Sequence, residues 1–82
     1  MNHKIVIIIE DISDDLLSCI YRSLKPEESI KIRGVELSLT EDQNSKKLVI
    51  SIESQKLNNL RATLYSTLRL INLTIDVIEN LT

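Results

Sequence analysis

Glycine, proline, cysteine and aromatic residues are all rare in this chain of 82 residues. It has one Gly, one Pro and one Cys, and Tyr21 and Tyr65 are its only aromatic residues. The single cysteine, Cys19, excludes an intramolecular disulfide, and its apolar neighbours indicate a packing residue. With so few turn formers we expect a regular, loop-poor single domain over residues 1–82. A chain of this size buries only about 60 to 65% of its unfolded surface, which leaves a thin margin of stability.

The chain also lacks the residue combinations that catalysis and metal binding require. His3 is its only histidine. No carboxylate pair, nucleophile with a base, or cluster of Cys and His occurs at ligand spacing. The single glycine, Gly34, lies at the start of a predicted strand, so no glycine-rich loop can cradle a phosphate. We therefore expect no enzymatic activity, no metal and no cofactor.

Charge and hydropathy exclude two further classes of protein. The formal net charge is −2, whereas a protein that binds mainly through phosphate contacts would have an excess of basic residues. No run reaches the roughly 18 apolar residues that span a bilayer. Glu10 and Asp11 close the N-terminal apolar run, which is not the pattern of a signal peptide. We expect a cytoplasmic protein that does not contact a membrane.

The N-terminal apolar run, Lys4 to Glu10, predicts a strand. Its β-branched residues do not alternate with polar ones, which is typical of a strand that is covered on both faces or paired at both edges. Ile5, Ile7 and Ile9 share one face, and Val6 and Ile8 share the other. In a small sheet with helices on one side only, Val6 and Ile8 would face water unless a partner covers them.

Two further strands and a helix follow. Ser13 has the properties of an N-cap, and Pro26 indicates a stop, so the first helix is predicted from about Asp14 to Leu24. Residues 35–40 and 47–53 then alternate apolar and polar residues, which predicts a hairpin with a loop of roughly five residues.

The stretch from Leu57 to Leu81 has apolar residues at helical spacing on two opposite sides. The stripe expected to cover the sheet contains Leu57, Leu60, Leu64, Leu68, Ile71, Ile75 and Ile78. The opposite stripe contains Ala62, Ser66, Leu70, Leu73 and Val77. This second stripe indicates either a partner protein or packing on the first helix of the same domain.

The end of this stretch fits both the period of a helix and the period of a strand. Ile71 to Val77 also alternates as a strand would, and a fourth strand there would complete a ferredoxin-like unit. The continuity with Leu57 to Leu70 and the absence of a turn favour a helix from Ile71 to Ile78.

The order β-α-β-β-α predicts an α+β fold with a three-stranded antiparallel sheet in the order 2-3-1 and two helices on one face. The apolar first strand then lies at an edge, which is a template for pairing with another chain. Val6 and Ile8 are accordingly the predicted dimer interface.

Two segments carry a resemblance to a known family. They are Tyr21 to Glu27, which reads YRSLKPE, and Leu60 to Arg69, which reads LRATLYSTLR. In this order and spacing they resemble the Pcc/CTAG family, the small dimerisation subunits of the KEOPS (EKC) complex. The family often has Asn where this chain has Tyr65, which leaves open whether the chain is similar to the principal subunit or to a divergent paralogue.

The resemblance implies a non-catalytic role in threonylcarbamoyladenosine modification of tRNA. It implies that the helices bind the catalytic threonylcarbamoyl-transferase subunit, that the chain pairs with itself or with a paralogue, and that tRNA is contacted within the complex. The matching positions are Leu60, Arg61, Ala62, Ser66 and Arg69. Leu70, Leu73 and Val77 join this partner-binding set because they continue the second stripe.

Two other classes remain as alternatives. A ferredoxin-like regulatory domain of the ACT type would need Ile71 to Ile78 to be a strand, and would usually have a glycine-bearing loop after the first strand. A small RNA-binding domain would need aromatic residues on the open sheet face and a basic surface.

Overall fold

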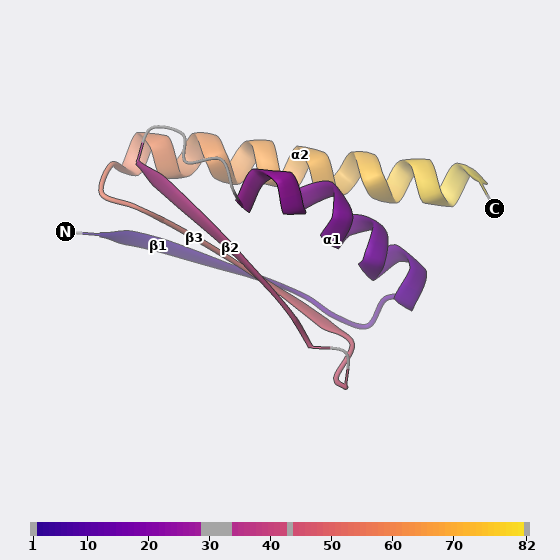
Figure 1. Ribbon diagram of the computed structural model, residues 1–82. Helices are drawn as coiled ribbons and strands as arrows, with labels where there is room; N and C mark the ends of the chain where they lie inside the picture. The colour runs from indigo at the N-terminus through magenta and orange to yellow at the C-terminus, as the bar shows by residue number, and fades with distance from the viewer. Residues whose placement is uncertain (1, 29–33, 43, 82) are drawn as a thin grey trace.

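The helices and strands follow one another in the predicted order β-α-β-β-α (Figure 1). The computed structural model describes residues 2–28, 34–42 and 44–81. Its elements are β1 (His3–Ile9), α1 (Asp14–Glu28), β2 (Val35–Asp42), β3 (Lys47–Ser54) and α2 (Leu57–Leu81). The hairpin joins β2 and β3 as predicted, and position 43 of its loop lies outside the described residues.

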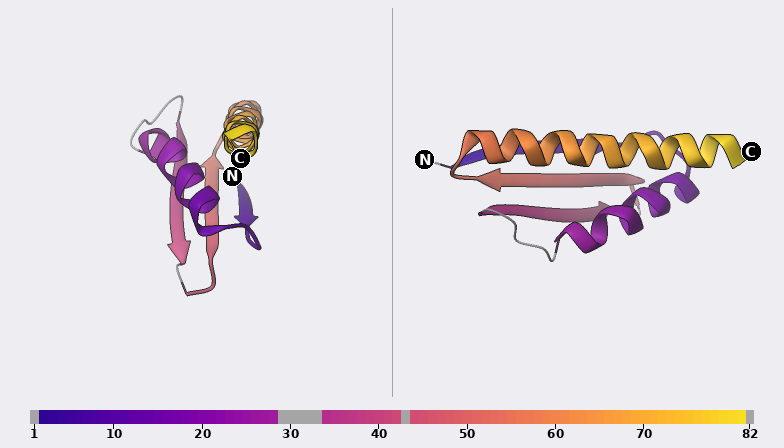
Figure 2. Two further views of the ribbon diagram at one scale, coloured as in Figure 1. Left: turned by 90° about the vertical axis from the view of Figure 1, so that its right-hand side faces the viewer. Right: turned by 90° about the horizontal axis from the view of Figure 1, so that it is seen from above.

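The three strands form an antiparallel sheet in the order β1-β3-β2. This is the predicted order 2-3-1, and it places β1 at an edge. The register aligns Ile7 of β1 with Ile50 of β3, and Ile50 with Leu39 of β2. Both helices cover the same face of the sheet, with α2 on the β1 side and α1 on the β2 side (Figure 2). The predicted α+β fold is therefore confirmed.

The core lies between this face of the sheet and the two helices. Every second residue of β3 is buried, because successive side chains of a strand point to opposite faces. The six largest fully buried side chains come from both helices and from β3: Ile20, Leu24, Leu48, Ile50, Ile52 and Leu60. Ile5, Ile7 and Ile9 pack against this cluster. The odd-numbered residues of β1 therefore face the helices.

The first helix begins where predicted and ends later. The Ser13 hydroxyl accepts a hydrogen bond from the N–H of Leu16 at 3.2 Å, which is the N-cap geometry. The helix continues through Pro26 to Glu28, so the predicted end at Leu24 is wrong. A proline removes one backbone hydrogen bond, but its φ suits a helix. Lys25 and Glu28, whose side chains form a 2.6 Å ion pair, belong to this added turn.

The second helix runs without a break, so the helical prediction for Ile71 to Ile78 is confirmed and the fourth strand is excluded. Ile71 is buried in the core, as predicted. However, Leu57 and Leu68 are 45% and 40% exposed, although they were predicted to cover the sheet. The buried side of α2 includes Thr67, which is 4% exposed. This side is turned partly toward α1, because α2 packs on both the sheet and α1. The sheet-facing stripe is therefore shifted around the helix toward α1.

Candidate interaction surfaces

The open face of the sheet is apolar at the β1 side and polar at the β2 side. Val6 is 49% exposed and Ile8 is 55% exposed, and both point away from the helices as predicted. Ile8 lies opposite Val49 of β3, which extends the apolar surface by one strand. The open-face residues of β2 are Glu36, Ser38, Thr40 and Asp42. An apolar partner would therefore be expected at the β1 side.

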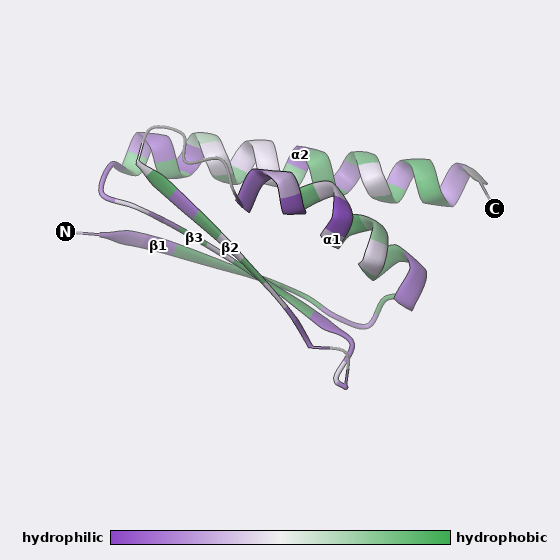
Figure 3. Ribbon diagram, in the orientation of Figure 1, coloured by the Kyte–Doolittle hydropathy of each residue, from purple (hydrophilic) through white to green (hydrophobic). Residues whose placement is uncertain are grey.

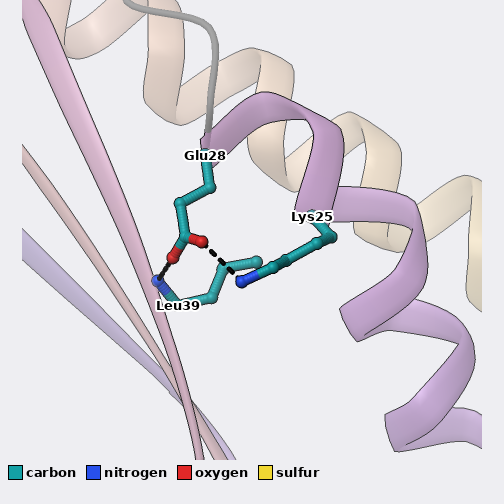
Figure 4. Close-up of polar contacts among 3 residues, drawn as sticks. All are labelled: Lys25, Glu28 and Leu39. Atoms are coloured by element: carbon teal, nitrogen blue, oxygen red, sulfur yellow. Dashed lines mark hydrogen bonds and ion pairs between the residues drawn. The ribbon is translucent and has the colours of Figure 1, made fainter.

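The two edges of the sheet differ. At the β2 edge, the backbone N–H of Leu39 donates a hydrogen bond to the Glu28 carboxylate at 2.7 Å (Figure 4). This N–H is therefore not available to another strand. At the β1 edge, no strand of the described chain lies beyond β1. A side chain thus occupies one backbone donor at the β2 edge, whereas the β1 edge has no such contact among the described residues.

Glu28 is held by two donors. Its other carboxylate oxygen accepts a 2.6 Å hydrogen bond from Lys25 Nζ (Figure 4). The bond from Lys25, and then the bond from the Leu39 N–H, lower the pKa of Glu28 below its ordinary value of 4.5. The bond to Glu28 in turn raises the pKa of Lys25, whose Nζ also lies 5.4 Å from the centre of the Tyr21 ring. The ionised carboxylate is therefore the form that suits this site.

A groove of about 370 Å³ opens between α1, β2 and the first half of α2. Its wall on α2 includes Ala62, Ser66 and Leu70 from the predicted partner-binding set. The remaining lining residues are Leu24, Glu27, Val35, Leu37, Asn59, Thr63 and Thr67. Leu70 is half-buried against the core, whereas Ala62 and Ser66 are exposed. Small exposed side chains at this wall allow a close approach by another helix.

The rest of the predicted partner-binding set is divided between surface and core. Leu73 and Val77 are 55% and 57% exposed, one turn apart in the second half of α2, where apolar residues are more frequent than in the first (Figure 3). Arg61 and Arg69 are also exposed. Leu60 is 2% exposed, which makes it a core residue. We call Ala62, Ser66, Leu70, Leu73 and Val77 the outer stripe of α2.

α2 has further exposed apolar residues, Leu57 and Leu68, whose exposure was not predicted from the sequence. Leu57 and Leu68 lie within about 20° of each other around the helix and about 100 to 120° from Thr74. Thr74 faces α1, because its hydroxyl lies 3.3 Å from that of Ser23. We call Leu57 and Leu68 the inner flank of α2. Their residue type and spacing are those of core residues, so periodicity alone gives no signal for their exposure.

Metal binding and membrane insertion have no visible basis in the described residues. Within residues 2–28, 34–42 and 44–81, no group of three or more His, Cys, Asp or Glu could hold a metal ion. In the same ranges, no helix has the length and apolar character needed to cross a bilayer. Both tyrosines lie on helices, so the open sheet face has no aromatic platform for RNA bases.

These features define a class of small α+β protein, with two helices on one face of a three-stranded sheet that is open at its other face and at one edge. A family model described as "Transcription factor Pcc1" matches residues 6–79. The chain therefore belongs to the Pcc1 family, the family of a non-catalytic subunit of the KEOPS complex, which acts in tRNA processing. No curated protein matches the chain.

Proposed function

We propose that this protein is a non-catalytic dimerisation and scaffold subunit of a KEOPS complex. In this role it supports threonylcarbamoyladenosine modification of tRNA in the cytoplasm by binding the catalytic transferase subunit. Membership of the Pcc1 family supports assignment to the complex. The observation that carries the scaffold role is the presence of two exposed apolar surfaces, Val6 with Ile8 and Leu73 with Val77, in one small domain.

The two surfaces lie on opposite sides of the molecule. Val6 and Ile8 are on the open face of the sheet, whereas α2 covers the other face. A partner on one surface therefore leaves the other accessible, which a subunit that joins two assemblies requires. Val6 and Ile8 contact a second copy or a paralogue, and the outer stripe of α2 contacts the transferase subunit. Contact with tRNA belongs to the complete complex, because the chain alone has a net charge of −2.

The outer stripe suits a helical partner. Ala62 and Ser66 set a close approach in the groove, and Leu73 and Val77 supply exposed apolar area further along the same helix. Apolar surface that a partner removes from water stabilises the complex by about 25 cal/mol per Å². Arg61 and Arg69 are exposed on the same helix and offer charged contacts at its rim.

Ala62→Arg tests this assignment most directly. Ala62 is exposed, so the long charged side chain does not disturb the isolated domain, but it would fill the wall of the groove that the partner approaches. The matched control is Asn72→Arg, which adds the same charge at another exposed position of α2. Binding of each variant to the purified transferase subunit is measured by titration, beside a thermal melt of each isolated variant.

We expect the two variants to melt like the unmodified chain and only Ala62→Arg to lose binding. Normal binding by a folded Ala62→Arg protein removes the outer stripe from the interface. A large loss of melting temperature for Ala62→Arg alone means that the groove belongs to the core of the domain.

A further inference from the structure

The hydrogen bond between Leu39 and Glu28 shows which backbone groups of β2 face outward. The N–H of Leu39 points out of the sheet, so Leu39 and its partner Ile50 form a non-hydrogen-bonded pair. The two kinds of pair alternate along a strand, so every second residue of β2 directs its N–H and C=O away from β3. These outward residues are Val35, Leu37, Leu39 and Glu41. They carry the backbone groups with which an added strand would pair.

The Glu28 carboxylate occupies the place that an added strand would need at Leu39. Neighbouring strands lie about 4.8 Å apart, and their carbonyl oxygens accept from N–H groups at about 2.9 Å. The Glu28 oxygen lies 2.7 Å from the Leu39 nitrogen, which is the position of such a carbonyl. Leu39 is the third of the four outward residues, so a strand that avoids it reaches only two in succession, Val35 and Leu37. The carboxylate therefore interrupts the edge, although it occupies a single donor.

Two other side chains of α1 hold Glu28 at this place (Figure 4). Lys25 Nζ donates a 2.6 Å hydrogen bond to the other carboxylate oxygen, and it lies 5.4 Å from the centre of the Tyr21 ring. Tyr21, Lys25 and Glu28 are separated by four and three residues, so they share one flank of α1. The Glu28 side chain is only 27% exposed there. The contact is therefore supported by three residues of one helix.

The same contact can open without disturbing the core. Glu28 is the last residue of α1, and Pro26 lies two residues before it. Proline has no N–H, so the last turn of α1 lacks one backbone hydrogen bond. The buried residues of α1 all precede this turn: Leu17, Ile20 and Leu24. A strand that competes for the Leu39 N–H can therefore displace Glu28 while the core stays packed.

A shallow pocket of about 460 Å³ lies on the same flank of α1. It is lined by Tyr21, Arg22, Lys25, Pro26 and Glu28. Because Glu28 belongs to the pocket and also contacts Leu39, the pocket lies beside the β2 edge on the side of the sheet that the helices cover. Every second side chain of an added strand would point to this side. The rings of Tyr21 and Pro26 offer these side chains an apolar surface.

The other side of an added strand would meet an acidic surface. The open-face residues of β2 are two carboxylates and two hydroxyls: Glu36, Ser38, Thr40 and Asp42. Glu36 lies beside Glu53 of β3, which adds a third carboxylate. The lysines of this face, Lys47 of β3 and Lys4 of β1, lie further from the β2 edge. Since opposite charges on facing strands stabilise a sheet, basic residues on this side of an added strand are favoured.

We propose that the β2 edge is a strand-binding site that Glu28 keeps closed, and that its ligand is an extended segment of another protein in which basic and apolar residues alternate. The basic side chains face Glu36 and Asp42, and the apolar ones face the pocket on α1. A backbone carbonyl of the segment replaces Glu28 at the Leu39 N–H. A second copy of β2 is a poorer occupant, because it would bring only acidic charges to an acidic edge.

Amide hydrogen exchange tests whether Glu28 closes the edge in solution. The unmodified chain is compared with Glu28→Ala and with Glu27→Ala, which removes the same charge from the exposed neighbouring position. We expect the Leu39 N–H to exchange about tenfold faster in Glu28→Ala than in the other two proteins. A thermal melt of each protein checks that it is folded. Equal exchange of the Leu39 N–H in all three proteins overturns the proposal.

A synthetic peptide tests whether the opened edge binds a strand. The probe has the length of β2, 8 residues, and alternates lysine with valine. The control peptide has proline at the two central valine positions, so it cannot pair as a strand. Each peptide is titrated into each protein, and the amide resonances of the outward residues of β2 are followed. We expect the probe to bind Glu28→Ala at least about tenfold more tightly than the unmodified chain or Glu27→Ala.

Electrostatics alone would give the opposite order. Loss of a carboxylate weakens the attraction of a basic peptide, so tighter binding by Glu28→Ala identifies the opening of the edge. Glu28→Gln keeps an oxygen that can accept from the Leu39 N–H and should bind the probe like the unmodified chain. Lys25→Ala leaves Glu28 in place without its support and should bind with intermediate affinity. A Glu28→Gln protein that binds as tightly as Glu28→Ala contradicts the hydrogen bond as the element that closes the site.

Three further results would overturn the proposal. Absence of binding to a folded Glu28→Ala protein shows that the opened edge takes no strand. Equal affinity of Glu28→Ala and the unmodified chain shows that Glu28 does not close the site. A larger mass of Glu28→Ala than of the unmodified chain in sedimentation, without peptide, makes a second copy the occupant. Each comparison uses the unmodified chain as its reference, so none depends on the proposed dimerisation or on binding of the transferase subunit.

Discussion

The carboxylate of Glu28, at the end of α1, accepts a 2.7 Å hydrogen bond from the backbone N–H of Leu39, on β2. This contact joins the last turn of a helix to the edge strand that follows it in the chain. It also leaves the two edges of the sheet unequal, because no described side chain makes such a contact with β1. The apolar strand that the sequence places first is therefore at the edge that remains open to a partner.

The contact makes the stability of the domain depend on pH. The pKa of Glu28 is lowered in the folded protein, so its ionised form stabilises the fold above its ordinary value of 4.5, and this contribution is lost as the pH falls through the lowered pKa. Glu28→Gln should therefore be less stable than the unmodified chain at pH 7 and nearly equal to it at pH 3. Urea unfolding at both pH values measures this. Glu27→Gln removes the same charge one residue earlier, and equal curves for the two variants would contradict the role of Glu28.

The open face of β1 should tolerate no charge. Val6→Lys combined with Ile8→Lys places two ammonium groups in the proposed dimer interface, so we expect a folded monomer by sedimentation. The control is Ser38→Lys with Thr40→Lys, which occupy the same two rows of the open face on β2. It should keep the dimer mass. A dimer that survives both pairs of substitutions places the interface elsewhere.

Leu73 should matter for assembly and not for folding. It is 55% exposed, so Leu73→Ala leaves the core of the domain intact. If the transferase subunit covers this side chain, the variant should bind it more weakly by about 1 to 3 kcal/mol, the value of a buried leucine. Titration with the transferase subunit measures the loss. Unchanged affinity, or a clearly lower melting temperature, would argue against this position as a contact.

Leu60 should behave in the opposite way. It is 2% exposed in the core, and Leu60→Ala should lower the free energy of unfolding by about 2 to 5 kcal/mol. That is a large part of the total for so small a domain. Denaturant unfolding of the isolated chain checks it. A loss below about 1 kcal/mol would mean that α2 does not cover the sheet as described.

The fold was predictable where one face of an element is buried and the other is not. Alternation in β2 and β3 indicates which residues face the core, and the Ser13 cap marks the start of α1. The open-face position of Val6 and Ile8 followed from the same period. The end of α1 was not predictable, because Pro26 is compatible with a last helical turn and the contact of Glu28 with β2 is not local in sequence.

The candidate site was only partly predictable. The outer stripe of α2 includes Leu70, which the structure half-buries, and Leu73, which it exposes, although both are leucines at helical spacing. The exposure of Leu68 depends on how far α2 is rotated over the sheet, which helical spacing alone does not give. The contact at Leu39 depends on a carboxylate eleven residues earlier in the chain. Neither the exposure of Leu68 nor the contact at Leu39 can be predicted from the spacing of apolar residues.

The mass of the chain in solution, alone and mixed with the catalytic transferase subunit, tests the scaffold role most directly. Light scattering after size exclusion should give twice the 9.4 kDa of one chain for the protein alone. The mixture should give one particle that contains two copies of each subunit. A monomer of 9.4 kDa that stays monomeric and forms no complex with the transferase subunit would contradict both the dimerisation and the binding role.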